Sequence, residues 1–469
     1  MRGGFAAMIF SPLTLILAMD IKQLYKLYQE HPCLTTDSRN CPEGSIFLAL
    51  RGDTFDGNQF AQAALDQGCA YAIVDRPECA TNDRCLLVDD CLATYKQLAR
   101  EHRRQFQIPV IAITGTNGKT TTKELVAAVL QKKYNVLYTQ ANYNNDVGVP
   151  KTLMRLTADH DIAVIEMGAS HPGDIRTLAE TAEPTCGLIT NVGRAHLQGF
   201  GSLKNVVKTK GELYDYLGRR GESLVFLNAD NDRLVDMLPD SVWVAPYSAN
   251  PDNAEGCTTG QVTACNPYLS IRWRESDTDL EERGEEVRWY DVATHLIGDY
   301  NLDNLLAAIT VGLNFAVSPA DICSALEAYE PSNNRSQLNV TAYNRLIVDA
   351  YNANPTSMRA AIDNFERIDA EQKMVILGQM NELGESSLRE HQKVVDRLAT
   401  MQLDGGVWLV GDEWQQANTS ELEAKGSGLR MFHSVDQVKE AIASDMPQGR
   451  SILIKGSNST RLYQLPALL

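Results

Sequence analysis

The segment Thr114-Gly115-Thr116-Asn117-Gly118-Lys119-Thr120-Thr121 decides the fold, because it joins a buried strand to a helix through a glycine-containing loop. The β-branched run 110–113 predicts the strand, and an apolar stripe predicts a helix over 121–132. Glycines let backbone N–H groups turn toward an anion, and the positive end of the helix dipole faces the same point. The segment therefore predicts a phosphate-binding loop in which Lys119 reaches the phosphates of ATP and the Thr120 hydroxyl binds Mg²⁺.

This loop is a shortened variant of the strict Walker pattern. The first glycine of that pattern would stand at Ile113, inside the strand, whereas the chain has its first glycine at Gly115. A purely structural turn is the alternative interpretation. The order strand, loop and helix favours nucleotide binding.

Composition limits the class of protein. A chain of 469 residues is long enough for two or three domains, and 44% hydrophobic residues are typical of a globular protein. The net charge of -17 argues against a nucleic-acid partner. No later apolar stretch reaches the roughly 20 residues that cross a bilayer, so stable membrane insertion is not expected.

The cysteines and the N-terminus indicate the compartment. The 10 cysteines include no Cys-x-x-Cys pair, which favours reduced thiols in the cytosol. Residues 1–18 resemble a weak signal peptide, but an upstream start codon with Met19 as the functional start is the alternative that we favour. We therefore expect a cytoplasmic protein.

Buried strands that alternate with helices predict an α/β protein of three domains, over residues 19–107, 108–330 and 331–469. The first is a small α/β unit with strands over 45–50 and 69–74 and a helix over 59–67. The second is a mostly parallel sheet with strands over 162–165, 187–190 and 224–227. It carries an antiparallel insertion over 257–290, whose acidic run 281–286 is expected at a solvated edge. The third is a Rossmann-like, doubly wound domain with strands over 346–348, 374–377, 407–410 and 452–454.

Several polar residues follow predicted strands. Glu166, His196 and Asp349 fall at or just after strand ends, and the carboxyl ends of parallel strands form the ligand edge of such a sheet. A phosphate-loop enzyme needs an acid to hold Mg²⁺ opposite the loop, which suits Glu166, although a capping or ion-paired glutamate is the alternative. The residues leave open whether His196 binds a metal or is structural.

Other candidates remain ambiguous from the residues alone. Lys210 has the pattern of a surface lysine on a helix. Asn301 and Asn304 open a helix, where they either cap its end or read an adenine edge. Arg335, at the junction of the second and third domains, is either a surface residue or a phosphate clamp.

Taken in chain order, these segments resemble the Mur ligase family from Asp20 onward. Three segments, 142–150 (NYNNDVGVP), 349–355 (DAYNANP) and 377–384 (LGQMNELG), are similar to one member, which joins D-alanyl-D-alanine to UDP-N-acetylmuramoyl-tripeptide. Asp37-Ser38-Arg39 with residues 44–50 resembles its UDP-binding domain. The resemblance implies these two substrates and a monomer.

The resemblance also implies roles for residues. Thr120 and Glu166 would hold one Mg²⁺, and Glu166, His196 and Lys210 a second, with Lys210 as an N-carboxylated lysine. Because carboxylation requires a neutral amine, we expect a depressed pKa for Lys210. The remaining implied contacts are Gly115, Thr116, Asn117, Gly118, Lys119, Thr120 and Thr121 to the ATP phosphates, Asn304 to adenine, Asp349 to ribose, Arg335 to the γ-phosphate, Ser38 and Arg39 near the uridine nucleotide, and Asn144 and Asn145 to substrate.

Two alternatives and four departures stay open. The alternatives are a ligase similar to folylpolyglutamate synthase and a phosphate-loop binding module without ligase activity. Ala141 stands where the family usually has Gly, Ser170 where it has Asn, Tyr300 where it has His, and Gln379 where it has Asp.

Overall fold

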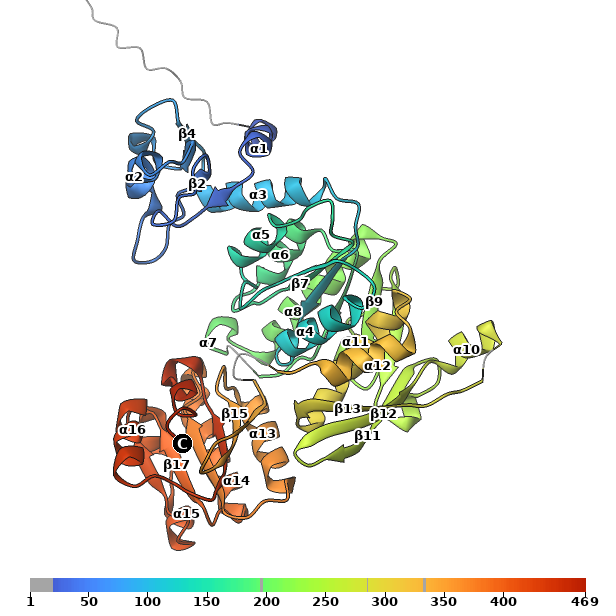
Figure 1. Cartoon of the computed structure of the whole chain (residues 1–469), viewed down its shortest axis with the longest axis vertical. Helices are drawn as coiled ribbons and strands as arrows, with labels where there is room; N and C mark the ends of the chain where they lie inside the picture. The colour runs from blue at the N-terminus through green and yellow to red at the C-terminus, as the bar shows by residue number, and fades with distance from the viewer. Residues whose placement is uncertain (1–19, 195–196, 285, 332–334) are drawn as a thin grey trace, which may run out of the picture. The chain divides into compact units, whose positions relative to one another are not determined.

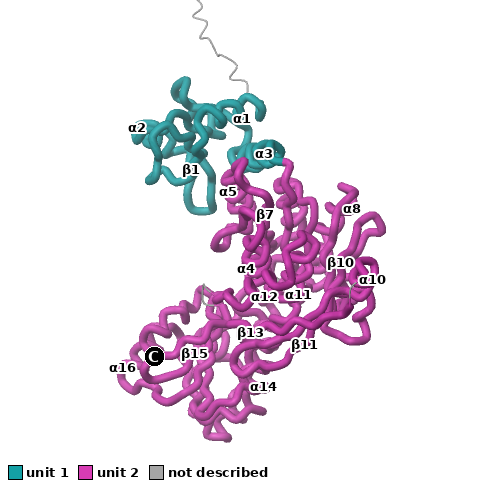
Figure 2. The backbone as a smooth tube through the Cα atoms, turned by 45° about the vertical axis from the view of Figure 1, so that its right-hand side comes forward, with its two compact units in different colours: residues 1–106 teal, residues 107–469 magenta. Residues whose placement is uncertain are grey.

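The computed structural model describes residues 20–194, 197–284, 286–331 and 335–469 (Figure 1). The chain divides into two compact units, Met1–Phe106 and Gln107–Leu469 (Figure 2). In the described residues, no helix is both long and apolar enough to cross a membrane. All ten cysteines are free thiols, as predicted.

The first unit is built on a four-stranded parallel sheet of order β1-β2-β3-β4. Strand β2 is buried at every position, which explains its continuous apolar sequence. The predicted helix over 59–67 is a 3₁₀ turn, Gly57–Phe60, followed by a shorter α-helix. The elements are β1 (Leu34–Thr35), β2 (Ile46–Leu48), β3 (Tyr71–Val74), β4 (Cys85–Leu87), α1 (Ile21–Glu30), α2 (Ala61–Asp66) and α3 (Cys91–Arg103).

The second unit contains a nine-stranded sheet of order β13-β12-β11-β10-β9-β8-β5-β7-β6. Its strands from β5 to β10 are parallel to their neighbours, and β5 and β7 are buried throughout because helices cover the sheet. The strands are β5 (Val110–Thr114), β6 (Val136–Tyr138), β7 (Ile162–Glu166), β8 (Cys186–Ile189), β9 (Leu224–Asn228), β10 (Trp243–Ser248), β11 (Thr258–Cys265), β12 (Tyr268–Arg274) and β13 (Tyr290–Ile297).

The predicted insertion is antiparallel, but it extends the central sheet. Strands β11, β12 and β13 pair antiparallel, while β11 also pairs in parallel with β10. The acidic run was expected at a sheet edge, whereas it begins within the exposed helix α10 (Asp277–Arg283). The first turn of α10 carries Asp277 and Asp279, which favour the positive end of the helix dipole.

An apolar core lies between the central sheet and three of its helices. That core gathers aliphatic and aromatic side chains of the sheet with those of α4, α11 and α12, and it includes the fully buried Trp273. The helices are α4 (Lys119–Leu130), α5 (Gly148–Leu153), α6 (Asp174–Ala182), α7 (Leu197–Phe200), α8 (Leu203–Arg220), α9 (Asp232–Val235), α11 (Leu302–Asn314) and α12 (Pro319–Ala328).

A six-stranded sheet of order β14-β15-β19-β16-β17-β18 completes the second unit. It is parallel except for the edge strand β14, and a separate apolar core lies on each of its faces, as a doubly wound sheet requires. The elements are β14 (Gln337–Val340), β15 (Arg345–Asp349), β16 (Lys373–Gly378), β17 (Gly406–Val410), β18 (Arg430–Phe432), β19 (Ser451–Lys455), α13 (Pro355–Arg367), α14 (Ser387–Thr400), α15 (Ser420–Ala424) and α16 (Val435–Ser444). The α/β class with three sheet-based domains is confirmed.

Candidate active site at the phosphate loop

The loop between β5 and α4 requires its glycines. Gly115 has φ +142°, and a Cβ there would lie 2.0 Å from Thr190 Oγ1. Gly118 has φ +81°, and a Cβ there would lie 2.5 Å from Asn304 Oδ1. Both positions combine a left-handed backbone with a close neighbour, so an alanine at either one would displace the loop.

Asn191 holds this loop in place, a role that sequence reasoning missed. Its backbone carbonyl accepts from Thr116 N at 2.9 Å, and its side-chain oxygen accepts from Asn117 N at 3.0 Å. The neighbouring Thr190 hydroxyl donates to the Asn117 carbonyl at 2.6 Å. The position of Asn191 just after β8, on the ligand edge, was the signal for this contact.

Lys119 begins α4 and lies over the loop. Its Nζ donates to the carbonyl oxygens of Gly115 at 2.9 Å and Thr116 at 3.0 Å. Burial lowers the pKa of Lys119, the Glu166 carboxylate raises it, and the nearby Arg335 lowers it again. Two cations and one carboxylate therefore converge here, an arrangement that suits an anionic phosphate chain.

Glu166, the last residue of β7, has 1% of its surface exposed. Its Oε1 accepts from Thr120 Oγ1 at 3.2 Å and from Asn144 Nδ2 at 2.8 Å, whereas its Oε2 is buried with no hydrogen-bond partner in the described residues. Burying a carboxylate oxygen without a hydrogen-bond donor costs free energy unless a cation binds it. Hard oxygen ligands on a carboxylate and a threonine are those that Mg²⁺ prefers, so these residues fit the ion.

Lys210 lies in the middle of α8 and has only 3% of its surface exposed. Burial, followed by the charge of Lys119, lowers the pKa of Lys210 to about 7. The carboxylates of Asp174, Glu212 and Glu166 act in the opposite direction and raise this pKa in part. The Nζ of Lys210 lies 6.0 Å from the centre of the Phe200 ring. The predicted depression of the pKa is confirmed, and the interpretation as a surface lysine is wrong.

His196 lies outside the described residues. Within the described ranges, no three His, Cys, Asp or Glu side chains gather as a metal-binding group. Among the described residues, the carboxylate of Glu166 and the hydroxyl of Thr120 are oxygen ligands that meet beside the loop.

Asn304 links α11 to α4 beside the loop. Its Oδ1 accepts from the Thr122 hydroxyl at 3.0 Å, and its Nδ2 donates to Asn301 Oδ1 at 2.9 Å. Asn301 donates in turn to the Ile297 carbonyl at 2.9 Å and forms no side-chain cap. The capping interpretation of these two asparagines is therefore wrong, because their amides form a buried chain.

The Rossmann-like domain contributes three groups. Asp349, at the end of β15, accepts a hydrogen bond from the buried Lys455. The Arg335 guanidinium carbon lies 3.8 Å from the centre of the Tyr351 ring. Asn354, which caps α13 through a capping box, also donates to Asn117 Oδ1 at 2.7 Å, so the phosphate loop is bonded to the start of that helix.

Asn144 and Asn145 differ in their surroundings. Asn144 donates to Glu166, as described above. The side-chain oxygen of Asn145 accepts from Gly148 N at 2.8 Å and Val147 N at 3.2 Å, at the start of α5. Asn144 is thus part of the site, while one polar atom of Asn145 is used by a helix start.

In the first unit, Ser38 and Arg39 lie on the loop after β1. The Arg39 guanidinium donates to both carboxylate oxygens of Asp37, each at 2.9 Å, and remains exposed. The Ser38 carbonyl accepts from Gln67 Nε2 at 3.0 Å, and Ser38 is partly exposed.

Comparison with known proteins gives a consistent result. Three family models match: the Mur ligase family catalytic domain over residues 32–128, the Mur ligase middle domain over 113–312, and the Mur ligase glutamate ligase domain over 334–458. A relative from Synechocystis, named UDP-N-acetylmuramoyl-tripeptide--D-alanyl-D-alanine ligase, is 33% identical, covering 92% of this chain and 90% of its own. The chain belongs to the Mur ligase family.

Other similar proteins belong to the same family. The Escherichia coli protein of the same name is 33% identical, covering 92% of both chains. A crystal structure of MurF from Acinetobacter baumannii has 30% identity and a TM-score of 0.80, covering 94% of this chain and 97% of that one. The chain is therefore an ATP-dependent, ADP-forming peptide ligase of peptidoglycan precursor synthesis, in the MurF branch of the Mur ligases. The alternative of a binding module without ligase activity is wrong.

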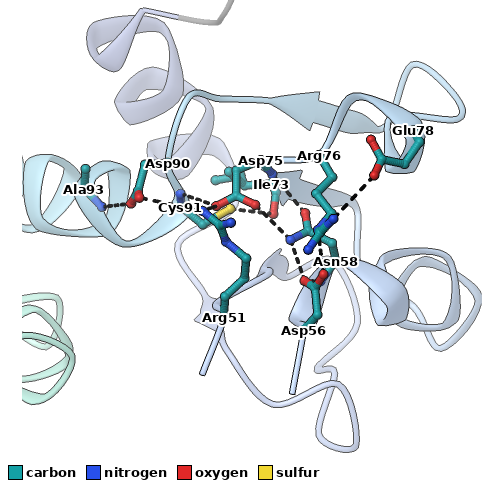
Figure 3. Close-up of polar contacts among 10 residues, drawn as sticks. All are labelled: Arg51, Asp56, Asn58, Ile73, Asp75, Arg76, Glu78, Asp90, Cys91 and Ala93. Atoms are coloured by element: carbon teal, nitrogen blue, oxygen red, sulfur yellow. Dashed lines mark hydrogen bonds and ion pairs between the residues drawn. The ribbon is translucent and has the colours of Figure 1, made fainter. Parts of the chain in front are cut away.

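In the first unit, a network of hydrogen bonds and ion pairs holds the loop 51–58 (Figure 3). Asp75, after β3, has 2% of its side chain exposed, pairs with Arg51 at 3.2 Å, and accepts from Asn58 at 2.8 Å and from Cys91 N at 3.1 Å. Asp56 pairs with Arg76 at 2.6 Å. The network joins residues 51–58 to the start of α3, and Phe55 within this segment is exposed. Sequence reasoning missed this loop.

The structure shows the surroundings of the four residues that depart from the family pattern. Ala141 has φ +48°, a left-handed backbone that favours the glycine usual in Mur ligases. The Tyr300 hydroxyl lies 3.1 Å from Ser336 Oγ, and Gln379 donates to Asn381 Oδ1 at 3.1 Å. Ser170 N donates to Asp174 at 2.9 Å, a contact that does not use its side chain.

Proposed function

We propose that this Mur ligase joins D-alanyl-D-alanine to UDP-N-acetylmuramoyl-tripeptide through an acyl phosphate formed at the loop 114–121. The contact of Thr120 with Glu166 carries the proposal, because it places a hydroxyl and a buried carboxylate with a free oxygen beside the phosphate-binding Lys119. The relatives that carry this name match over nine-tenths of the chain, which favours these substrates over the folate-type acceptor.

In the first step, the terminal carboxylate of the tripeptide attacks the γ-phosphate of ATP and releases ADP. The chain's task is positioning and charge neutralisation, since two anions must meet. Lys119 and Arg335 supply positive charge, and Gly115 to Thr121 supply backbone N–H groups to the phosphates. Asn304 binds the adenine and Asp349 the ribose.

Thr120 and Glu166 would hold one Mg²⁺, and Glu166, His196 and Lys210 would hold a second. The ions neutralise phosphate charge when bound. Asn144 keeps the Glu166 side chain oriented through its 2.8 Å hydrogen bond.

Lys210 acts as an N-carboxylated lysine. Its neutral amine adds to the carbon of CO₂, forms a C–N bond and releases one proton, which gives a carbamate anion. The lowered pKa of about 7 leaves a large share of the amine neutral near physiological pH, and the neutral amine is the reactive form. The carbamate converts a buried cation into an oxygen ligand, which also removes the repulsion between Lys210 and Lys119.

In the second step, the amine of the dipeptide attacks the acyl phosphate carbon, phosphate leaves, and a peptide bond forms. Water must be excluded, because an acyl phosphate hydrolyses readily. Ser38 and Arg39 contact the uridine nucleotide, and Asn144 and Asn145 the peptide substrate. The enzyme is a cytoplasmic monomer with domains over 19–107, 108–330 and 331–469. The test is phosphate release from ATP, measured with each substrate omitted in turn.

A further inference from the structure

Arg335 is held by an aromatic ring. Strand β14 pairs antiparallel with β15, with Gln337 opposite Val348. Arg335 lies two residues before Gln337, and Tyr351 lies three residues after Val348. The same antiparallel register, continued past the ends of the two strands, brings these two residues close together. There the guanidinium carbon lies 3.8 Å from the centre of the Tyr351 ring, well inside the range of a cation–π contact.

No carboxylate fixes this guanidinium within the described residues. Its Nε is buried without a hydrogen-bond partner, and the ring is the contact that orients the group. Stacking and ion pairing have different consequences. A carboxylate would neutralise the guanidinium and occupy its donors, whereas a ring contacts the flat face and leaves the in-plane N–H groups for another anion.

The stacked guanidinium acts electrostatically on Lys119 of the phosphate loop. Its charge is close enough to Lys119 to contribute to the lowered pKa of that amine. Both side chains belong to the second unit, and Asn354, three residues after Tyr351, is hydrogen-bonded to Asn117 of the loop. The aromatic residue, the arginine and the loop are thus connected through one short stretch, 351–354.

We propose that Tyr351 is a positioning residue, which holds the Arg335 guanidinium by stacking so that its N–H groups meet the phosphate transferred from ATP. The inference rests on the proposed role of Arg335 as the γ-phosphate clamp. Tyr351 itself makes no contact with the reacting atoms. Its aromatic face is what matters, and its hydroxyl is dispensable.

The test compares three single variants and one double variant in the phosphate-release assay with both substrates. Tyr351→Phe keeps the ring and retains the parental kcat. Tyr351→Leu removes the ring and lowers kcat about tenfold, the size expected for loss of a cation–π contact, with little change in the KM for ATP. In an Arg335→Ala background, Tyr351→Leu has no further effect, because the group that it orients is gone.

Three outcomes overturn the inference. One is a parental kcat in Tyr351→Leu together with a low kcat in Arg335→Ala, which leaves the clamp intact and removes only the positioning role. Another is an effect of Tyr351→Leu that persists undiminished without Arg335. A parental kcat in Arg335→Ala refutes the clamp itself, and with it the part of the proposed function on which the inference rests. Tyr351 is partly exposed, and Tyr351→Gln replaces Tyr351→Leu if the leucine variant loses its cooperative unfolding transition.

Discussion

The hydroxyl oxygen of Thr120 lies 3.2 Å from Oε1 of Glu166, although the two residues are 46 positions apart. Thr120 is in the first turn of α4, and Glu166 is the last residue of β7. They meet because β5 and β7 are parallel neighbours, so that the end of β7 lies beside the loop that leaves β5. Oε2 of Glu166 is buried without a hydrogen-bond partner, so a bound cation would compensate its charge.

Glu166→Gln tests this carboxylate. The amide keeps an oxygen for the hydrogen bonds from Thr120 and Asn144 but loses the charge that a divalent ion requires. We expect turnover to fall by at least about a hundredfold, with cooperative unfolding retained. Glu180→Gln, an exposed change on α6, is the matched control and keeps parental turnover. Parental turnover in Glu166→Gln contradicts the metal-ligand role.

Lys210→Ala tests the carboxylated lysine. We expect ligation to be nearly abolished, and a small carboxylate anion such as acetate to restore part of it, because the anion replaces the oxygens of the carbamate. Lys208→Ala, an exposed lysine on the same helix, stays fully active and gains nothing from acetate. Full activity of Lys210→Ala, without any added anion, would refute the proposed role.

The pH dependence of stability provides a second test of Lys210. Its folded pKa of about 7 lies below its ordinary value of 10.5, so the unfolded chain binds more protons between these pH values. Stability contributed by this group therefore rises with pH across that window and is lowest below pH 7. In CO₂-depleted buffer, Lys210→Met should be more stable than the parent near pH 7, and the difference in free energy of unfolding should shrink toward pH 10. A constant difference would mean that the lysine titrates normally.

Ala141→Gly tests the strain at the left-handed residue of the 139–147 loop. Because φ is +48° there, glycine removes a steric penalty, and we expect the free energy of unfolding to rise by about 1 kcal/mol. Ala158→Gly, at an exposed turn position that is not among the left-handed residues, gives no such gain. Denaturant unfolding measures both variants. A loss of stability in Ala141→Gly equal to that in Ala158→Gly would show that the left-handed backbone carries no penalty.

Strand ends were the predictable part of this molecule. Glu166 and Asp349 lie where the apolar runs before them indicated, because a buried parallel strand has a continuous apolar sequence that ends at the ligand edge. Lys210 could not be recognised from the residues, since it lies on the same helix as the exposed Lys208 and no local pattern marks it as the buried lysine of the two.

Long-range partners were the unpredictable part. Asn191 bonds to the phosphate loop across 74 residues, and Asn304 to Thr122 across 182. The place of Asn191 just after β8 indicates the ligand edge but not its bonding partner, and the contact of Asn304 leaves no local pattern. The antiparallel insertion was predicted, but its place in the central sheet depends on the pairing of β10 with β11, which periodicity does not encode.

The most direct measurement is phosphate release from ATP by the purified chain, with UDP-N-acetylmuramoyl-tripeptide and D-alanyl-D-alanine present together, singly or not at all. The tripeptide is supplied in its diaminopimelate and lysine forms in separate assays. We predict sustained release only when a tripeptide and the dipeptide are both present, with one peptide bond formed for each phosphate released. Phosphate release at the same rate without either substrate would contradict the account.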